Sequence, residues 1–257
     1  MSEIRCSIAG TIATVSLSNP GKLNALDVSM WQELRSTFNA LSANTDLRCV
    51  IVQGEGGNFA AGADIEEFVT VRSNMVDGMR YHTETIAQAL HAIANCLHPT
   101  IAAIEGVCVG GGLEIACACD IRIASPSSRF GIPINRLGFP LAPGELQGLL
   151  DLVGKAAALE ILLEGRVFDA AEARDKGLIQ RIVENVPDEA QQSAGRISRG
   201  APLAARMNKQ LVNRLSFAAE PLTEQELKQA FAFLESQDYR EGVSSFLKKT
   251  PPNFTGQ

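Results

Sequence analysis

Two runs of small residues constrain this chain more than any other feature. The first is Phe59-Ala60-Ala61-Gly62-Ala63-Asp64, and the second is Gly110-Gly111-Gly112-Leu113-Glu114. Small side chains leave peptide N–H groups unshielded, and glycine tolerates backbone angles that other residues avoid. Each run therefore suits a backbone that lies close to another group. One N–H group from each run would suffice to bind a carbonyl oxygen as it becomes negative, with Glu114 beside it as an acid or base.

Composition indicates an ordinary globular protein. The 257 residues are 46% apolar and 20% charged, which suits one large domain or a core with an appendage. The net charge of −6 argues against a nucleic-acid surface. No apolar stretch approaches the length of a membrane span, and the N-terminus lacks a basic-then-apolar signal. The six cysteines form no Cys-x-x-Cys pair, so we expect buried free thiols, no zinc site and a reducing, cytoplasmic setting.

Short apolar runs alternate with helical patterns along most of the chain. A β-hairpin is expected from about Ile4 to Leu17, and Asp27 is placed to cap a helix whose apolar residues recur at helical spacing. A long helix is expected to end near His98, before Pro99. Short strands are predicted over Cys49–Val52, Thr100–Ile104 and Ile121–Ala124. This alternation predicts an α/β fold with a largely parallel sheet, followed by a helical section from about residue 200.

The two glycine-containing runs have structural readings as well as functional ones. Gly110-Gly111-Gly112 would aim a helix N-terminus at a gap, which favours developing negative charge, but it also suits a tight turn. A dinucleotide fingerprint would need glycine where Ile115 stands, and no phosphate-binding Gly-Lys-Ser/Thr sequence is present. Glu114 is either a charge that compensates the helix dipole or a partly buried acid. Asp64 is placed to cap a short helix.

Three segments taken together carry a resemblance: Asn19–Leu26, Phe59–Ile65 and Gly106–Asp120. With these three segments in this order, the chain resembles the crotonase family, also called the enoyl-CoA hydratase/isomerase superfamily. The resemblance implies a crotonase-like spiral of ββα units with a helical C-terminal region, and a homotrimer or dimer of trimers. It divides the chain into a core over residues 1–199 and a trimerisation or lid region over residues 200–257. The ligand it implies is an acyl-CoA thioester, so that coenzyme A is part of the substrate and no separate cofactor is expected.

The resemblance also assigns residues to the site. The thioester oxygen would lie between the N–H groups of Ala63 and Gly111, with Glu114 as the acid or base. The residues implied to contact the substrate or its CoA portion are Lys22, Leu23, Ala25, Ala61, Gly62, Asp64, Ile65, Gly110 and Ile134. An apolar acyl pocket is expected around Ile132, Ile134, Leu137, Phe139 and Leu141.

The chain departs from the family pattern where a second catalytic acid is expected. Hydratases of the family carry a second glutamate in a Phe-Gly-x-Pro-Glu sequence, and Ile134 stands in its place here. Glu145 lies further along and is either a substitute acid that turns inward or a solvated residue in the first turn of a helix, with the solvated reading slightly favoured. Tyr81, His82, His91 and His98 are further titratable candidates, each of which is more often structural.

With one clear acid, double-bond isomerisation or decarboxylation is favoured over efficient hydration. An isomerase needs one group that moves a proton between carbons, and a decarboxylase needs mainly an oxyanion hole and a proton donor. The alternative is a catalytically silent acyl-CoA-binding member of the family. Neither reading involves nucleic acid or a membrane.

Overall fold

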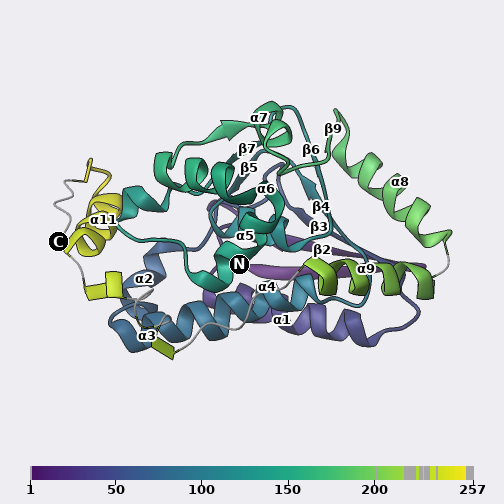
Figure 1. The fold of residues 1–257 in the computed structure, drawn as a ribbon, viewed down its shortest axis with the longest axis horizontal. Helices are drawn as coiled ribbons and strands as arrows, with labels where there is room; N and C mark the ends of the chain where they lie inside the picture. The colour runs from purple at the N-terminus through teal and green to yellow at the C-terminus, as the bar shows by residue number, and fades with distance from the viewer. Residues whose placement is uncertain are drawn as a thin grey trace.

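A six-stranded sheet runs through the middle of the structure (Figure 1). The protein is represented by a computed structural model that describes residues 2–200, 202–216, 224–225, 228, 232–235 and 237–252. The strand order in the sheet is β1-β2-β3-β4-β6-β9. These strands are β1 (Glu3–Ala9), β2 (Ile12–Ser18), β3 (Cys49–Gly54), β4 (Thr100–Ile104), β6 (Ile121–Ala124) and β9 (Arg181–Ile182). A three-stranded sheet holds β5 (Val107–Val109), β7 (Arg129–Gly131) and β8 (Phe168–Asp169).

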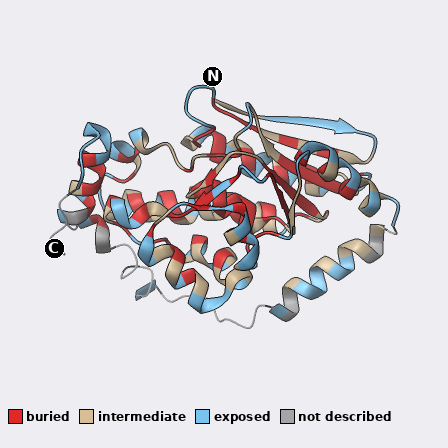
Figure 2. Ribbon diagram, turned by 90° about the horizontal axis from the view of Figure 1, so that it is seen from above, coloured by how far each residue is buried: buried red, intermediate tan, exposed pale blue. Residues whose placement is uncertain are grey.

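The pairing of the strands confirms the predicted sheet. β1 and β2 form an antiparallel hairpin in which Glu3 lies opposite Ser18, and every other pair in the six-stranded sheet is parallel. The outer strand β1 is largely exposed, as its pale colour in Figure 2 shows. Cys6 lies on this strand and is exposed, so the expectation of buried thiols is wrong there, whereas the other five cysteines are buried and all six are free.

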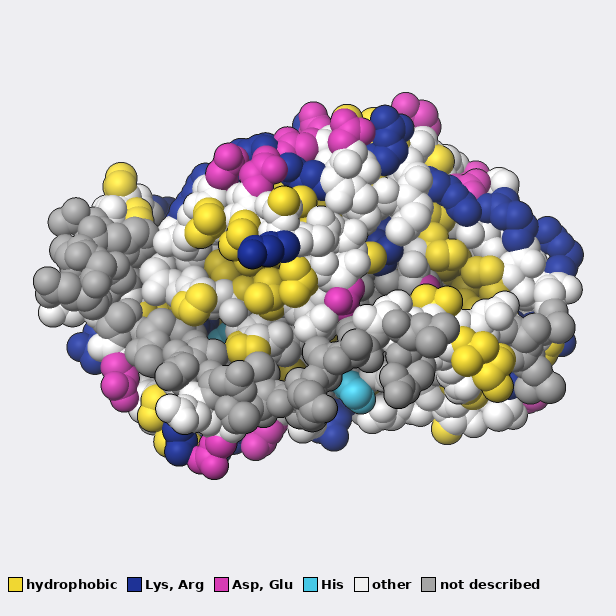
Figure 3. All heavy atoms as spheres, viewed as in Figure 1, with side chains coloured by type: hydrophobic (Ala, Val, Ile, Leu, Met, Phe, Trp, Pro, Cys, Tyr) yellow, Lys and Arg dark blue, Asp and Glu magenta, His cyan; other side chains and the backbone are white. Residues whose placement is uncertain are grey.

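Helices surround both sheets. They are α1 (Val28–Ala43), α2 (Phe68–Val71), α3 (Met75–Arg80), α4 (Ala87–Ala94), α5 (Gly111–Ala118), α6 (Pro143–Glu164), α7 (Ala170–Asp175), α8 (Val186–Ser198), α9 (Pro202–Ser216) and α11 (Gln237–Lys248). The short turns of helix are η1 (Ile65–Glu67), η2 (Tyr81–Ile86), η3 (Pro133–Leu137) and η4 (Ala232–Glu235). Along one edge of the molecule, acidic and basic side chains alternate (Figure 3). Between α6 and α7, Arg166 forms ion pairs with Glu164 and Glu172.

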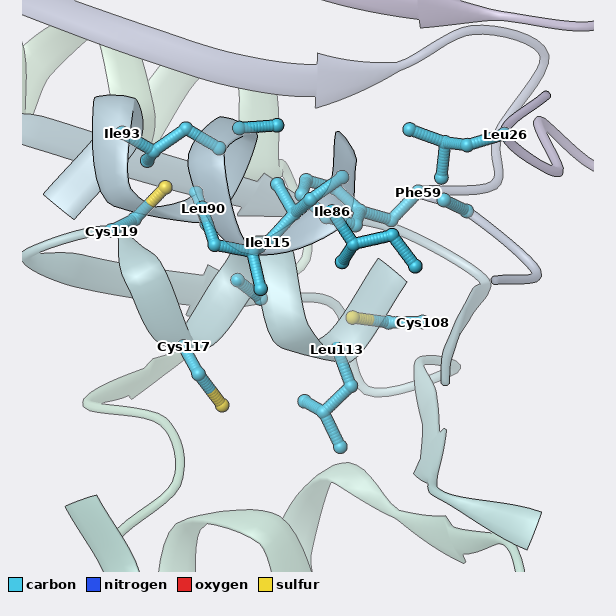
Figure 4. Packing of buried hydrophobic residues seen from close by; sticks show 14 of the residues in the cluster. Leu26, Phe59, Ile86, Leu90, Ile93, Cys108, Leu113, Ile115, Cys117 and Cys119 are labelled. Atoms are coloured by element: carbon cyan, nitrogen blue, oxygen red, sulfur yellow. The ribbon is translucent and has the colours of Figure 1, made fainter. Parts of the chain in front are cut away.

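The two faces of the sheet are covered by different helices because alternate strand residues point to opposite sides. Val50 and Val52 of β3 belong to the large core that includes residues of α1, α4 and α5. Cys49 and Ile51 of the same strand pack with residues of α8, including Val186. Figure 4 shows part of the large core, in which side chains from η2, α4, α5 and two loops lie together: Leu26, Phe59, Ile86, Leu90, Ile93, Leu113 and Ile115.

Helix α1 begins as the sequence predicts. The Asp27 carboxylate accepts a hydrogen bond of 2.8 Å from the Met30 N–H, which satisfies one of the donors that a helix N-terminus leaves open. The buried face of the helix carries Trp31, Leu34 and Phe38, each with no exposed surface. Trp31 matters for the site because its ring lies where a Cβ atom on Gly111 would go.

The helical stretch before Pro99 differs from its prediction. It runs from Met75 to Ala94 as α3, η2 and α4, and η2 is a π-helical turn. The helix ends at Asn95, whose side-chain amide donates to the carbonyl of His91. The prediction that the helix ends near His98 is therefore wrong by about one turn, because the Asn95 cap ends the helix before Pro99 is reached.

The C-terminal region is mostly helical where the structure describes it, in α9, η4 and α11. Of residues 200–257, residues 201, 217–223, 226–227, 229–231, 236 and 253–257 lie outside the described part. Helix α11 packs on η3, and a methyl group built on Gly242 would lie 2.1 Å from the backbone of Leu137. Among the described helices, none combines the length and the apolar character needed to span a membrane.

Replacement of Asp27 with alanine tests the cap of α1. We expect the free energy of unfolding to fall by about 0.5–2 kcal/mol, because the Met30 N–H loses its acceptor. Asp27→Asn keeps a side-chain oxygen acceptor and should stay close to wild type. Urea unfolding followed by circular dichroism measures both variants, and an equal loss in the two would contradict a capping role.

Candidate active site

Backbone hydrogen bonds hold the loop after β2 beside the first run of small residues. The Ala61 N–H donates to the Leu23 carbonyl at 2.9 Å, and the Leu26 N–H donates to the Gly62 carbonyl at 2.7 Å. The side-chain amide of Asn24 donates to the carbonyl of Asn58 at 2.7 Å. Leu23 and Asn24 adopt positive φ angles of 50° and 58°, which residues other than glycine rarely do. The surrounding bonds therefore keep this loop in one conformation.

The two runs of small residues lie directly against each other. A methyl group built on Gly112 would lie 2.3 Å from the Ala60 carbonyl oxygen, and one on Gly62 would lie 3.2 Å from the Val109 carbonyl oxygen. Gly62 and Gly110 also have positive φ angles of 101° and 50°. The glycines are thus required by close approach of two backbones and by their torsion angles.

This approach brings two backbone amides close together. A methyl group on Gly111 would lie 3.5 Å from the Ala63 nitrogen, and one on Gly62 would lie 3.3 Å from the Gly111 nitrogen. Within the described part of the chain, neither the Ala63 N–H nor the Gly111 N–H donates a hydrogen bond. Gly111 is the first residue of α5, where a helix leaves its N–H groups without internal acceptors. Both residues line one cavity.

Glu114 lies in the first turn of α5 and lines the same cavity. Only 7% of the residue is exposed, so it is not a surface charge that merely compensates the helix dipole. Burial raises the pKa of the Glu114 carboxyl well above its usual range, and the nearby Glu145 carboxyl raises it further.

Glu145 also turns into the cavity, from the first turn of α6. It is 5% exposed, so the slightly favoured reading of a solvated glutamate is wrong. Helix α6 begins at Pro143, and the Glu145 N–H donates to the Ala142 carbonyl. Burial raises the pKa of Glu145 to about 8, against the opposing effect of the Arg72 charge. Two carboxyl groups from different helices therefore face one space.

His82 connects to this acid. Its Nδ1 atom lies 2.6 Å from Glu145 Oε1, and both side chains are buried. Burial holds the pKa of the His82 ring well below its usual range, and the charge of Arg72 lowers it further. Because the ring is neutral and the pKa of the carboxyl is raised, a hydrogen bond can join them in two ways. Either the Glu145 carboxyl donates its proton to Nδ1, or the ring tautomer that is protonated at Nδ1 donates to Glu145. The contact fixes the direction of the Glu145 side chain in either case.

The cavity has a volume of about 90 Å³ and a mostly apolar wall. Its apolar side chains include Trp31, Phe68, Ile86, Ile134, Leu137, Phe139 and Leu141. Four of the five residues expected around the acyl pocket line this cavity, namely Ile134, Leu137, Phe139 and Leu141, whereas Ile132 is buried in the core and does not line it. Of the residues expected at the substrate, those that line the cavity are Ala61, Gly62, Ala63, Ile65, Gly110, Gly111, Glu114, Ile134 and Glu145.

Four expected CoA contacts do not line the cavity. Lys22 forms ion pairs of 2.7 Å with both Asp64 and Glu66, Leu23 is half-exposed, and Ala25 is buried. Asp64 caps the turn η1 by accepting from the Glu66 N–H, as predicted. Lys22 would have to leave these carboxylates before it could bind a phosphate, so its role stays a prediction.

Comparisons with known proteins identify the family of the chain. A family model described as "Enoyl-CoA hydratase/isomerase" matches residues 7–257. The chain belongs to the enoyl-CoA hydratase/isomerase family. A relative named "Probable enoyl-CoA hydratase" from Rhizobium meliloti is 36% identical over 250 residues, which cover 95% of each chain.

Solved structures of this enoyl-CoA hydratase/isomerase family confirm the crotonase fold. An enoyl-CoA hydratase/carnithine racemase from Magnetospirillum magneticum is 44% identical, with a TM-score of 0.82 over 99% of this chain and 96% of that one. A methylmalonyl-CoA decarboxylase in complex with 2-nitronate-propionyl-CoA is 27% identical, with a TM-score of 0.88 over 99% and 98%. The family therefore contains enzymes with different acyl-CoA reactions on one fold.

The sequence did not indicate Arg72 as a residue of the cavity, and it indicated His82 only as one of several titratable candidates. Arg72 lines the cavity, yet nothing in its local sequence, Phe68-Val69-Thr70-Val71-Arg72, marks it as buried. His82 was only one of several titratable candidates. His91 is exposed and the Nε2 atom of His98 contacts the Leu41 carbonyl, so neither lines the cavity.

The raised pKa of Glu145 predicts a pH dependence of stability. The folded protein keeps this proton up to about pH 8, whereas the ordinary pKa of the unfolded chain is 4.5. Between these values the folded state binds more protons, so the free energy of unfolding falls as the pH rises. Since glutamine does not titrate, wild type should lose at least about 1 kcal/mol relative to Glu145→Gln between pH 5 and pH 8.

Urea unfolding at intervals over this range measures the difference. Glu66→Gln, at a side chain that is 70% exposed, is the matched control and should follow wild type. Parallel curves for wild type and Glu145→Gln would show that Glu145 is ionised throughout the range.

Proposed function

We propose that this protein is an acyl-CoA enzyme that forms a thioester enolate, whose oxygen accepts hydrogen bonds from the N–H groups of Ala63 and Gly111. One observation carries the proposal: two neighbouring amides without acceptors in the described chain and two buried carboxyl groups line one cavity. Buried acids with shifted pKa values cost stability and are concentrated at functional sites, which argues against the silent acyl-CoA-binding alternative.

The two amides would stabilise the enolate, whose formation is the difficult step of the reaction. A proton on the α-carbon of a thioester is weakly acidic, and its removal becomes feasible when the resulting negative charge is stabilised on oxygen. Fixed N–H donors do this without the reorganisation that water requires, and the loss of one such donor typically costs about 2.7–4 kcal/mol. The N-terminus of α5 adds its positive dipole end at Gly111.

The two carboxyl groups supply complementary proton transfers. The two carboxyl groups repel each other when both are ionised, so that once one of them has lost its proton the other stays protonated. In that singly ionised pair, the carboxylate acts as base while the other carboxyl acts as acid. Glu114 and Glu145 would then remove a proton at one carbon and deliver one at another, which is isomerisation of a double bond. Hydration would also use two carboxyl groups, but by family resemblance the second hydratase glutamate belongs where Ile134 stands, and Glu145 enters the cavity from α6 instead, so efficient hydration is disfavoured. The small cavity suits a short acyl group.

Decarboxylation is the second candidate. The solved methylmalonyl-CoA decarboxylase gives a TM-score of 0.88 over nearly the whole chain. Loss of carbon dioxide next to a thioester produces the same enolate, and the same amides would stabilise it. This reaction needs one proton donor, so the second buried acid favours isomerisation.

As part of the same proposal, the assembly follows from the family and the setting follows from the cysteine usage. Residues 200–257 would serve as a trimerisation and lid region of a homotrimer or dimer of trimers in the cytoplasm. The exposed apolar side chains of Met207, Leu211 and Val212 on α9 support an interface there. The packing of α11 against η3, which contributes to the cavity wall, supports the lid role.

A pair of variants at Gly111 tests the oxyanion hole. Gly111→Pro removes the N–H at the first helical position, which tolerates proline, and Gly111→Ala adds a Cβ but keeps the N–H. A Cβ at this position meets the Trp31 ring at 2.9 Å in both variants. In deuterated water, with short enoyl- and saturated acyl-CoA esters followed by mass spectrometry, exchange of the α-hydrogen should be about 10²–10³-fold slower in Gly111→Pro than in Gly111→Ala.

Glu114→Gln should abolish this exchange, since its side chain cannot accept the proton. The proposal fails if no thioester in the panel exchanges in wild type, or if the proline and alanine variants exchange at the same rate.

His82 is proposed as a positioning residue for Glu145. His82→Leu removes the 2.6 Å contact, whereas His82→Asn keeps a polar atom near the place of Nδ1. We expect His82→Leu to lower kcat for isomerisation and to move the basic limb of the kcat–pH profile, with little change in KM. His82→Asn should recover much of both. A fall in kcat with an unmoved profile in both variants would leave His82 with a packing role only.

A further inference from the structure

The cavity wall contains the largest fully buried side chain of the described protein. This side chain is Trp31, which lies in the first turn of α1 and has no exposed surface. The proposed reaction gives its ring no role of its own. Met30 and Leu34, its neighbours on the buried face of the helix, have no exposed surface either. The helix therefore cannot turn this face away from the core, and the ring stays at the cavity.

The ring of Trp31 is held against the start of α5. A Cβ atom built on Gly111 would lie 2.9 Å from Trp31 Cζ2 and 3.3 Å from Trp31 Cη2. The same Cβ position lies 3.5 Å from the Ala63 nitrogen. The ring is thus beside the two amides that are proposed to bind the thioester oxygen. The first carbons of a bound acyl chain would therefore run past this ring.

Stability alone does not explain a tryptophan at this position. Among the residues that the structure describes, none accepts a hydrogen bond from the buried Trp31 Nε1–H. Burial of a donor without an acceptor lowers stability, and a buried tryptophan usually finds a partner. A leucine or a phenylalanine would bury apolar surface in a helix without this cost. Departures of this kind from the rules of stable packing are expected where a side chain serves a functional site.

The cavity beside the ring is small. Its volume of about 90 Å³ compares with roughly 300–1,000 Å³ for pockets that bind drug-sized ligands. Helix α1 packs against η2, and Ile86 of η2 and Phe68 of α2 continue the apolar wall. Protein interiors are close-packed and relax only partly when a side chain is shortened. A smaller side chain in place of Trp31 would therefore enlarge this cavity.

We propose that Trp31 is the specificity-determining residue that restricts the enzyme to short acyl groups, because a longer chain would collide with its ring. This inference rests on the proposed function, since it concerns the acyl group of the same substrate. An indole ring is rigid, so it sets a sharper limit than an aliphatic side chain, which can rotate aside. In a hydrophobic pocket, one methylene group changes kcat/KM by about 10–200-fold.

A series of straight-chain thioesters tests the proposal. Exchange of the α-hydrogen in deuterated water is measured for acetyl-, butanoyl-, hexanoyl- and octanoyl-CoA. At one step of this series the kcat/KM of wild type should fall at least about tenfold, and in Trp31→Leu the fall should move to a longer ester. Phe38→Leu is the matched control and should keep the wild-type profile, because Phe38 lies on the same helix, is equally buried and does not line the cavity. An identical profile in wild type and Trp31→Leu overturns the proposal.

The fluorescence of wild type supplies a test without turnover, because Trp31 is the only tryptophan in the chain. At saturation, verified by isothermal titration calorimetry, butanoyl-CoA should change the emission of Trp31 more than coenzyme A without an acyl group does. Equal changes for the two ligands would show that the acyl group does not reach the ring, and would overturn the proposal.

Circular dichroism verifies that the variants fold. If Trp31→Leu does not fold, the fluorescence of wild type and the length profile of Trp31→Phe decide the outcome, and the profile of Trp31→Phe should shift less but in the same direction. Exchange of esters with an unchanged length profile overturns only this inference, whereas no exchange of any ester in wild type overturns the proposed function.

Discussion

The close approach of two backbones is the constraint on which the rest of the site depends. Residues 60–63 and 109–112 touch along a line where even a methyl group would collide, as at Gly112 against the Ala60 carbonyl. Only glycine or alanine permits this approach, and only glycine readily adopts the positive φ angles of Gly62 and Gly110. The approach leaves the Ala63 and Gly111 amides as neighbours on one cavity wall. The parallel sheet and α1, through Trp31, hold the two segments in this relation.

A second constraint is the burial of charge around these amides. Glu114, Glu145 and Arg72 are each less than 8% exposed and line the same small cavity. A core built only for stability would hold apolar residues in these places, because buried ionisable groups cost more than they return. The chain instead links Glu145 to His82 and surrounds Arg72 with aromatic rings. Ionisable groups with such shifted pKa values are concentrated at functional sites.

Local sequence was sufficient for the features that depend on neighbouring residues. The β1–β2 hairpin, the Asp27 cap, the short buried strands and the turn at Asp64 all follow from turn chemistry and periodicity. The family resemblance supplied the fold and placed Ala63, Gly111 and Glu114 on one site. The inward turn of Glu145 was not predictable in this way, because a glutamate in the first turn of α6 satisfies the same local rules whether it faces solvent or a cavity. Arg72 gave no local signal at all, since its environment comes from α2, the loop after η3 and α11, which are far apart in sequence.

Hydrogen bonds from the Ala63 and Gly111 amides would lower the bond order of the thioester carbonyl group. If the amides of Ala63 and Gly111 bind the thioester oxygen, an acyl-CoA labelled with carbon-13 at that carbonyl should show a stretching frequency that is lower when bound than when free in water. Difference infrared spectroscopy of the complex measures this shift without any turnover. A clear downward shift is the result that we predict. A bound thioester whose carbonyl frequency equals or exceeds that of the free ligand would contradict the account.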